Sequence, residues 1–394
     1  MFRLSQFVRE MLEPGSQRKP GVPPGPVVIW NLIRRCNLLC KHCYSISADT
    51  NFKGELNTEE ALTVLNDLKQ FRVPALILSG GEPLMRPDIH QLGIAAKELG
   101  IYTGLSTNGT LINESNIDEI AAAGYDYVGI SLDGLRETHD AFRRKEGAFD
   151  DSLHAVKLCL DAGIKVGLRF TITAGNSHEL KDLVQLSEDL GVDKFYLSHL
   201  NYAGRGNKNR GEDAFHRTTR DAVEMLIEQA IKDHENGFMR DIVTGNNDAD
   251  GVYLYQWALK NYPDRAEHLR EHLIAWGGNQ SGRYISNIDN LGNVHPDTFW
   301  WEHTLGNVRE KPFSEIWSQS DDQLLSEFRM QPRPLKGRCG VCQQREICGG
   351  NTRVRAFQLY KDAWEEDPAC YLTDDEIGVD PSMYSERINM EAMG

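Results

Sequence analysis

Short apolar runs alternate with longer amphipathic stretches from residue 27 to about residue 200. Of all the features of this sequence, this alternation limits the possible folds most strongly. A βα repeat of this kind implies parallel strands with helices outside, here a partial (β/α)6 barrel of the α/β class. The predicted strands are Val27–Leu32, Ala75–Leu78, Tyr102–Leu105, Tyr127–Ile130, Lys165–Thr171 and Phe195–Ser198. The predicted helices are Glu59–Phe71, Ile89–Leu99, Glu114–Ala123, Ser152–Ala162 and His178–Leu190.

Three cysteines follow the first predicted strand directly, with the spacing C-x3-C-x2-C: Cys36, Cys40 and Cys43. Three thiolates can ligate only three irons of a four-iron cluster, so the fourth iron stays open to an amine and a carboxylate of a small molecule. Zinc is an alternative, although His42 has little freedom to complete its coordination beside Cys43. A disulfide framework is disfavoured because the eight cysteines are clustered along 394 residues.

Glycines and small polar residues follow the next three predicted strands as well, in the segments 79–83, 106–109 and 131–134. Any one of these segments alone would be explained as a turn. The carboxyl ends of the strands in a parallel barrel meet on one side, which is where the chemistry of such folds takes place. We therefore expect the cysteines and these three segments to form one site.

In this order after the cysteine triplet, the segments resemble the S-adenosylmethionine (SAM) binding loops of the radical SAM superfamily. The resemblance implies that Ser131 and Arg143, twelve residues apart, contact the SAM carboxylate, which an arginine can bind through two hydrogen bonds. An exposed surface cation is the alternative for Arg143, and a turn-forming role is the alternative for Asn108 and Asp133. The implied SAM-binding residues are Gly80, Gly81, Glu82, Asn108, Ser131 and Arg143.

The superfamily resemblance also implies that the cofactors carry the chemistry. A reduced 4Fe-4S cluster would cleave SAM to a 5′-deoxyadenosyl radical, which abstracts a hydrogen atom from the substrate. We expect an electron donor such as ferredoxin or flavodoxin, and no catalytic acid or base. The protein would hold the cluster, exclude water and position one C–H bond.

A second group of cysteines lies near the end of the chain with the spacing C-x2-C-x5-C-x21-C, at Cys339, Cys342, Cys348 and Cys370. Four thiolates complete a 4Fe-4S cluster without an open iron, and zinc in the same site is the alternative. The surrounding sequence resembles the SPASM extension or its shorter twitch form. Asp297 stands where the full form tends to have a cysteine, so we expect two clusters in total. The eighth cysteine, Cys159, is expected in the core.

Three longer sequence segments resemble the NirJ family, the radical SAM enzymes of haem d1 biosynthesis; they are residues 194–210, 244–251 and 293–301. That resemblance implies 12,18-didecarboxysirohaem as the substrate, with removal of the propionates of rings A and B on the way to the dioxo product. The alternatives are a sister haem-pathway decarboxylase or deacetylase, a SPASM-type peptide maturase, and a protein that only transfers electrons.

An iron tetrapyrrole that carries carboxylates requires cations and aromatic surface. A basic loop follows the sixth predicted strand, and its alternative interpretation is a solvated turn. Phe299, Trp300 and Trp301 could supply the aromatic surface. The candidate substrate-binding residues are Arg205, Lys208 and Arg210, followed by Arg169, Arg353 and Arg355, with His199 and His295 as candidate axial iron ligands.

The net charge of −15 argues against nucleic acid as a partner, because a phosphate backbone requires a clustered positive surface. Charged residues interrupt the apolar residues of segment 1–12, so we expect no membrane anchor and a cytoplasmic location. We predict an extended N-terminal lead-in over 1–25, the partial barrel over 26–200, a helical linking segment over 201–280 and the auxiliary cluster domain over 281–394.

Overall fold

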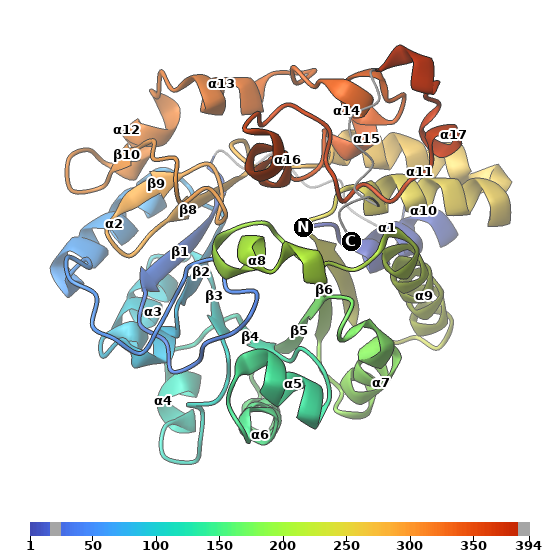
Figure 1. The fold of residues 1–394 in the computed structure, drawn as a ribbon. Coiled ribbons are helices and arrows are strands. Elements are labelled where there is room, and N and C mark those ends of the chain that lie inside the picture. Colours follow the sequence, from blue (N-terminus) through green and yellow to red (C-terminus); the bar gives the residue numbers. More distant parts are fainter. Residues whose placement is uncertain (16–24, 385–394) are drawn as a thin grey trace.

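The computed structural model describes residues 1–15 and 25–384. Its ten-stranded sheet has the order β10-β9-β8-β1-β2-β3-β4-β5-β6-β7 and curves around the centre of the molecule (Figure 1). The six predicted strands are confirmed and pair in parallel along the chain, which confirms the α/β class. They are β1 (Val27–Ile33), β2 (Ala75–Gly80), β3 (Tyr102–Thr107), β4 (Tyr127–Ser131), β5 (Val166–Ile172) and β6 (Lys194–His199).

The five predicted helices are also present and connect these strands. Helix α2 shows why they form locally, since Asn57 and Glu60 make a capping box at its start and Val64, Leu65 and Leu68 bury one face. An additional helix, α5 (Arg136–Arg143), follows β4. The five helices are α2 (Thr58–Gln70), α3 (Ile89–Glu98), α4 (Ile117–Ala122), α6 (Ala148–Asp161) and α7 (Leu180–Asp189).

The sheet continues through segments for which the sequence predicted other roles. Strand β7 (Asp241–Gly245) lies within the predicted helical segment 201–280 and pairs in parallel with β6. Strand β8 (Ile285–Ile288) pairs in parallel with β1, and β9 (Asn293–His295) and β10 (Gly306–Asn307) extend the sheet as antiparallel strands. The segment 201–280 also holds the helices α9 (His216–Glu235), α10 (Ala249–Asn261) and α11 (Pro263–Trp276).

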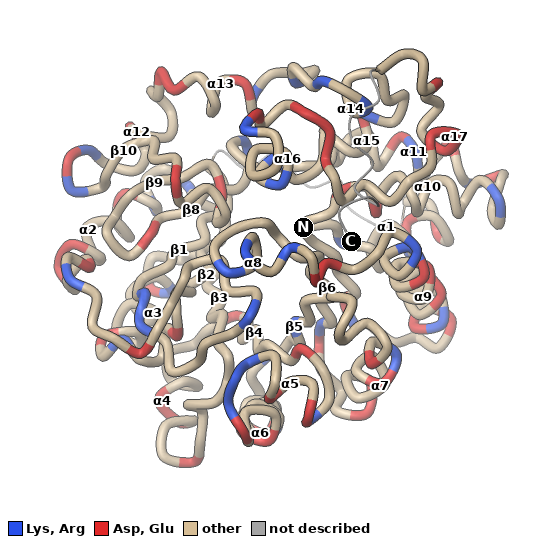
Figure 2. The backbone as a smooth tube through the Cα atoms, in the orientation of Figure 1, with Lys and Arg blue, Asp and Glu red and all other residues tan. Residues whose placement is uncertain are grey.

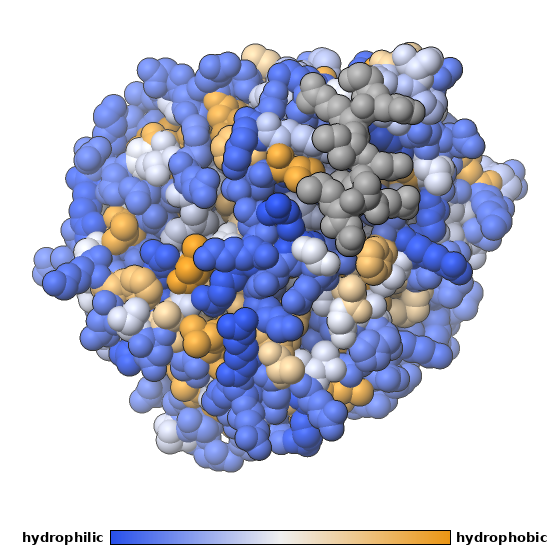
Figure 3. Space-filling view, in the orientation of Figure 1, coloured by the Kyte–Doolittle hydropathy of each residue, from blue (hydrophilic) through white to orange (hydrophobic). Residues whose placement is uncertain are grey.

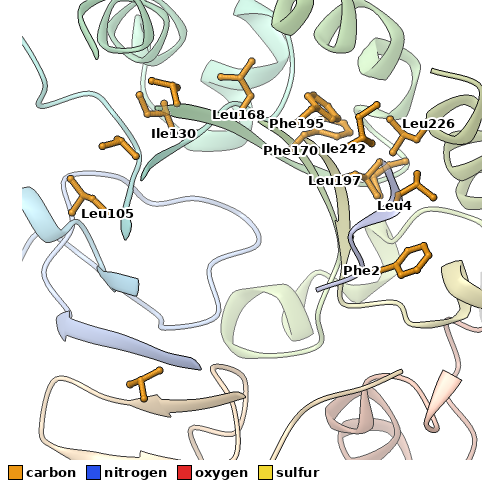
Figure 4. Packing of buried hydrophobic residues seen from close by; sticks show 14 of the residues in the cluster. Phe2, Leu4, Leu105, Ile130, Leu168, Phe170, Phe195, Leu197, Leu226 and Ile242 are labelled. Atoms are coloured by element: carbon orange, nitrogen blue, oxygen red, sulfur yellow. The ribbon is translucent and has the colours of Figure 1, made fainter. Parts of the chain in front are cut away.

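The prediction of an extended lead-in over 1–25 is wrong for Leu4–Leu12, which form helix α1. Leu4, Val8 and Met11 recur at helical spacing and are fully buried, so burial of an apolar face stabilises the helix. Phe2 and Leu4 pack beside Leu197 and Ile242 in the core at the β7 edge of the sheet (Figure 4). Residues 16–24 lie outside the described residues.

The last part of the chain crosses the upper end of the molecule in Figure 1 and has a small apolar cluster of its own around Trp300, Phe328 and Trp364. None of the helices formed by residues 1–15 and 25–384 is long and apolar enough to cross a membrane. The face shown in Figure 3 is hydrophilic over most of its area. The remaining helices are α8 (Gly204–Lys208), α12 (Phe313–Ser318), α13 (Gln323–Arg329), α14 (Gly337–Val341), α15 (Arg345–Cys348), α16 (Arg353–Tyr360) and α17 (Asp374–Ile377).

Candidate functional site

The loop after β1 brings Cys36, Cys40 and Cys43 together, with the first two buried and the third partly exposed. Every sulfur faces a polar side chain from a different part of the site. Asn108 Nδ2 lies 4.0 Å from the Sγ of Cys36, Arg143 Nη1 lies 3.4 Å from that of Cys40, and Ser45 Oγ lies 3.3 Å from that of Cys43. Such N–H and O–H groups suit charged sulfur ligands.

The electrostatics of the loop fit a bound cluster. Burial raises the pKa of Cys36 to about 12 and also raises the pKa of Cys40, with Arg143 opposing the rise at Cys40. At Cys43 burial acts in the same direction, but Arg205 and the hydrogen bonds from Ser45 and Ser47 together outweigh burial, and the pKa is lowered. Iron binds thiolates, so cationic neighbours around buried thiols are what three cluster ligands require.

The glycines Gly80 and Gly81 pack against the start of the cysteine loop. The amide of Gly81 donates to the carbonyl of Ile33 at 2.6 Å, and the amide of Glu82 donates to that of Arg35 at 2.9 Å. A Cβ on Gly81 would lie 2.2 Å from the oxygen of Arg35, so only glycine fits. The resemblance to SAM-binding loops attributes these glycines to the close approach of SAM. The structure adds a second reason, which is their close packing against the backbone of the cysteine loop.

Glu82 is fully buried and joins the loops that follow β2 and β3. Its carboxylate accepts hydrogen bonds from Thr107 Oγ1 at 2.7 Å, the Asn108 amide at 2.8 Å and the Leu84 amide at 3.1 Å. Burial raises the pKa of Glu82, and these donors oppose the rise. Glu82 therefore shapes the site, and its predicted contact with SAM stays a prediction.

Arg143 ends α5 and is only 6% exposed, so the surface-cation alternative is wrong. Its guanidinium lies between the sulfur of Cys40 and the carboxylate of Asp133, with which it forms an ion pair. Burial would raise the pKa of Asp133, but Arg143, two histidines and the amide of Thr171 together outweigh burial and the pKa is lowered. Arg143 thus lies near the end of β4, where Ser131 is found, and its contact with the SAM carboxylate remains a prediction.

The predicted basic loop after β6 begins with a short helix, α8, and this changes the interpretation of Arg205. The Arg205 guanidinium donates from Nε to the carbonyl of Cys40 at 2.7 Å and from Nη1 to that of Ser47 at 2.8 Å. Its amide donates to the carbonyl of Cys43 at 2.8 Å. Arg205 therefore fastens the cysteine loop through two of its nitrogens, while its Nη2 has no partner among the described residues and its contact with the substrate stays a prediction. Lys208 and Arg210 are exposed.

Helix α8 also connects the cysteine loop to the C-terminal segment. Gly204 has a positive φ of 55°, and a Cβ there would lie 2.3 Å from the carbonyl oxygen of Tyr44. Three residues later, the amide nitrogen of the Asn207 side chain donates to Gln358 of α16 at 3.0 Å. Close packing against the cysteine loop therefore explains the glycine.

Asn201 is a candidate site residue that the sequence reasoning missed. It follows β6, and its side-chain nitrogen and oxygen are buried without a hydrogen-bond partner among the described residues. Two unpartnered polar atoms at a strand end are suited to a polar ligand. Its position three residues after the predicted strand Phe195–Ser198, at the edge where the other polar segments lie, was a signal that could have identified it.

The second group of cysteines lines one cavity, together with Leu335 and Arg338. Burial raises the pKa of Cys339 to about 12 and that of Cys342 to about 11. Arg338 Nη1 lies 3.4 Å from the sulfur of Cys370. Four thiols around one cavity, with a cation beside them, fit a 4Fe-4S cluster or a zinc ion. Cys159 is fully buried in the core, as predicted.

Several other candidates for substrate contacts have partners within the protein. His295 uses both ring nitrogens, at 2.7 Å from the carbonyl of His303 and 3.4 Å from Asp289, which leaves no nitrogen for an iron. His199 Nε2 lies 2.9 Å from Asp250. The two buried arginines of α16 bind other groups: Arg353 the carbonyls of Ala363 and Glu365, and Arg355 the carboxylate of Asp367.

Alanine at Cys36, Cys40 and Cys43 should halve the iron content and abolish SAM cleavage, because the open iron is lost. Alanine at the four C-terminal cysteines should also halve the iron content while some uncoupled SAM cleavage persists. Iron analysis and quantification of 5′-deoxyadenosine check both outcomes. An unchanged iron content in the second variant would exclude a second iron–sulfur cluster.

Arg205→Ala should weaken cluster retention roughly 10- to 100-fold, the usual cost of losing a residue that orients metal ligands. The measurement is the rate of iron loss to a chelator under anaerobic conditions. Arg205→Lys should rescue only part of the effect, since a lysine cannot donate to two carbonyls in the same geometry. Arg210→Ala is the control, and equal rates for the alanine variants at 205 and 210 would refute the fastening role.

The comparisons with known proteins agree with this geometry. The radical SAM superfamily matches residues 30–190. The Pre-heme d1 synthase of Dinoroseobacter shibae is 56% identical over 96% of this chain and 94% of its own length. The Fe-coproporphyrin III synthase of Methanosarcina barkeri is 44% identical over 90% of this chain and 89% of its own. The crystal structure of Streptococcus suis SuiB bound to S-adenosylmethionine has the same fold, with a TM-score of 0.68 and 19% identity over 89% of this chain and 78% of SuiB. The chain therefore belongs to the radical SAM superfamily, in the family that includes Pre-heme d1 synthase.

Proposed function

We propose that this protein is the radical SAM enzyme of haem d1 biosynthesis that acts on 12,18-didecarboxysirohaem. It would initiate removal of the propionate side chains of rings A and B on the way to the dioxo product. The observation that carries the proposal is the 56% identity to a Pre-heme d1 synthase over nearly the whole length of both proteins. The agreement in length matters because the C-terminal cysteines lie within the shared region.

The residues of the first site have distinct tasks in this proposal. Cys36, Cys40 and Cys43 hold the 4Fe-4S cluster, which supplies the electron for reductive cleavage of SAM to the 5′-deoxyadenosyl radical. Gly80 and Gly81 bring the backbone beside the cysteine loop, where it can bind the amino group of SAM. Arg143, buried beside Cys40, carries the positive charge that a SAM carboxylate requires. A ferredoxin or flavodoxin would deliver the electron.

The second site is proposed to hold an auxiliary 4Fe-4S cluster. Its four cysteines come from α14, the residue after it, the end of α15 and the segment before α17, and they converge on one cavity. Gathering four partly buried thiols without a metal is unfavourable, because burial raises the pKa values of Cys339, Cys342 and Cys348 and neighbouring thiolates repel one another. Zinc analysis distinguishes this proposal from a zinc site.

An iron tetrapyrrole with carboxylate side chains would bind where aromatic surface meets positive charge. Tyr44 follows the last cysteine of the loop and contacts Phe299 edge-on at 5.5 Å between ring centres, with Trp301 at 6.5 Å. Figure 2 shows Lys and Arg along α8 and just after it, at the end of α5 and on α16, and Arg143 of α5 and both arginines of α16 are buried there. Among them, Lys208 and Arg210 are exposed and are our candidates for propionate contacts. Arg169, inside the barrel, already contacts Ser106 and the ring of Tyr196.

A sister haem-pathway enzyme is the nearest alternative, because a Fe-coproporphyrin III synthase is 44% identical to this chain. A peptide maturase is the second alternative, since the fold is also that of SuiB, for which a complex with its precursor peptide SuiA is known. Substrate and product masses separate these possibilities, because the three reactions change different groups.

The deciding assay incubates the reconstituted protein anaerobically with 12,18-didecarboxysirohaem, SAM and dithionite. We expect formation of 5′-deoxyadenosine together with a tetrapyrrole that has lost mass from its propionate groups. Fe-coproporphyrin tested in parallel should remain unchanged. Conversion of didecarboxysirohaem to Fe-coproporphyrin, with the mass lost from acetate groups and the propionates retained, would assign the protein to the sister reaction.

Lys208→Gln combined with Arg210→Gln should weaken binding of didecarboxysirohaem while SAM cleavage persists. Exposed ion pairs contribute up to about 1 kcal/mol each, so the double variant should bind up to about 30-fold more weakly. An absorbance titration measures this, and Arg217→Gln, an exposed arginine on α9, is the matched control. Equal titration curves for the double variant and the control would remove these two residues from the substrate site.

A further inference from the structure

Three side chains with metal-binding atoms meet away from both cysteine sites, where α1 packs on α11. They are Glu10 of α1 and the two histidines His268 and His272 of α11. One ligand atom of each lies within 4.8 Å of the other two. We propose that Glu10, His268 and His272 form a site for a divalent transition metal ion, with zinc as the preferred ion.

The two histidines have the spacing that places imidazoles on one face of a helix. Residues four apart are neighbours on a helix surface, and here the ring centres are 4.6 Å apart. Both rings direct Nε2 toward the same carboxylate oxygen, at 3.0 Å for His268 and 3.7 Å for His272. Ligands of a tetrahedral zinc ion are about 3.3 Å apart, so the two distances bracket the required separation.

The carboxylate is held in place for this role. Glu10 is 2% exposed, so the packing around α1 and α11 holds its side chain in one position. The amide of Gly15 donates to the Glu10 Oε1 atom at 2.8 Å, as expected for an outer contact that orients a metal ligand. Arg265, one turn before His268, is directed to the carbonyls of Met11 and Leu12 at the end of α1.

The donor set selects the class of ion. Two neutral imidazoles and one carboxylate suit zinc and similar transition metal ions, whereas calcium and magnesium prefer oxygen ligands alone. The histidine side chains are 34% and 22% exposed, so an ion can enter from solvent and water can complete its coordination. Each imidazole would bind through Nε2 with its proton on Nδ1.

The position of the site suggests that the ion is structural. Helix α1 lies along the β7 edge of the sheet, where the Ser5 hydroxyl accepts a hydrogen bond from the amide of Ile242 at 3.0 Å. Helix α11 packs against α15, which carries Cys348. A metal ion here would fasten the N-terminal helix to the helix that supports the C-terminal cysteines.

The test titrates zinc into the protein with both iron–sulfur sites filled, under anaerobic conditions and against a chromophoric chelator. We expect one zinc ion per chain and a higher unfolding temperature. The double variant His268→Ala/His272→Ala should bind zinc at least 100-fold more weakly, since loss of an outer contact alone costs roughly 10- to 100-fold. His154→Ala is the matched control, because His154 has a single exposed carboxylate partner, Glu114.

X-ray absorption at the zinc edge identifies the ligands. Nitrogen and oxygen neighbours at about 2.0–2.1 Å, without sulfur at about 2.3 Å, are expected. Equal zinc binding by the wild-type protein and the double variant, or a sulfur shell around the zinc, would overturn the proposal. Glu10→Gln keeps an acceptor for the Gly15 amide while removing the charge, so weaker zinc binding without loss of folding in that variant supports it.

Discussion

The structure depends on keeping three thiols together in a buried loop. Burial raises the pKa values of Cys36 and Cys40, so the charged sulfurs that a cluster needs are unfavourable unless positive charge is close. Arg143 supplies that charge beside Cys40, and Arg205 supplies it beside Cys43. One arginine follows β4 and the other follows β6, so the parallel sheet, which gathers its carboxyl ends, is what makes the arrangement possible.

The same sheet connects the two cysteine sites. The turn after β7 reaches the residues that follow Cys348, where the Asn351 side chain donates to Asn247 at 2.6 Å and accepts from the amide of Asp248 at 2.7 Å. Helix α8 makes a second connection through Asn207 and Gln358. These contacts fix the C-terminal segment relative to the barrel, because they are short and two of them are buried. Any movement of the C-terminal cysteines would therefore strain the loops around the first site.

The sequence predicts the elements whose signal is local and misses those that depend on tertiary contacts. The six strands and both cysteine groups follow from period and spacing. Strand β7 was missed because its apolar core is only Ile242 and Val243, and α1 was missed because a run rich in proline and glycine follows it. Helix α8 contains Gly204 and Gly206, which disfavour a helix locally. The carbonyls of Cys43 and Tyr44, distant in sequence, explain Gly204, whereas the nearby carbonyl of Asn201 explains Gly206.

The assignment of arginines narrows how an anionic substrate can bind. Arg143 pairs with Asp133, Arg205 donates to two carbonyls of the cysteine loop, and Arg353 and Arg355 of α16 are buried against the C-terminal segment and the carbonyl of Leu200. These contacts occupy most of the donors of the four guanidiniums, so exposed cations are the better candidates for the substrate carboxylates. The exposed cations are Lys208, at the end of α8, and Arg210, two residues later, and an ion pair at an exposed position contributes up to about 1 kcal/mol. Exposed ion pairs that contribute so little free energy cannot distinguish tetrapyrroles that differ in one side chain. Under the proposed function, discrimination must therefore come from shape and aromatic contact around Tyr44, Phe299 and Trp301, where a macrocycle can bury its faces.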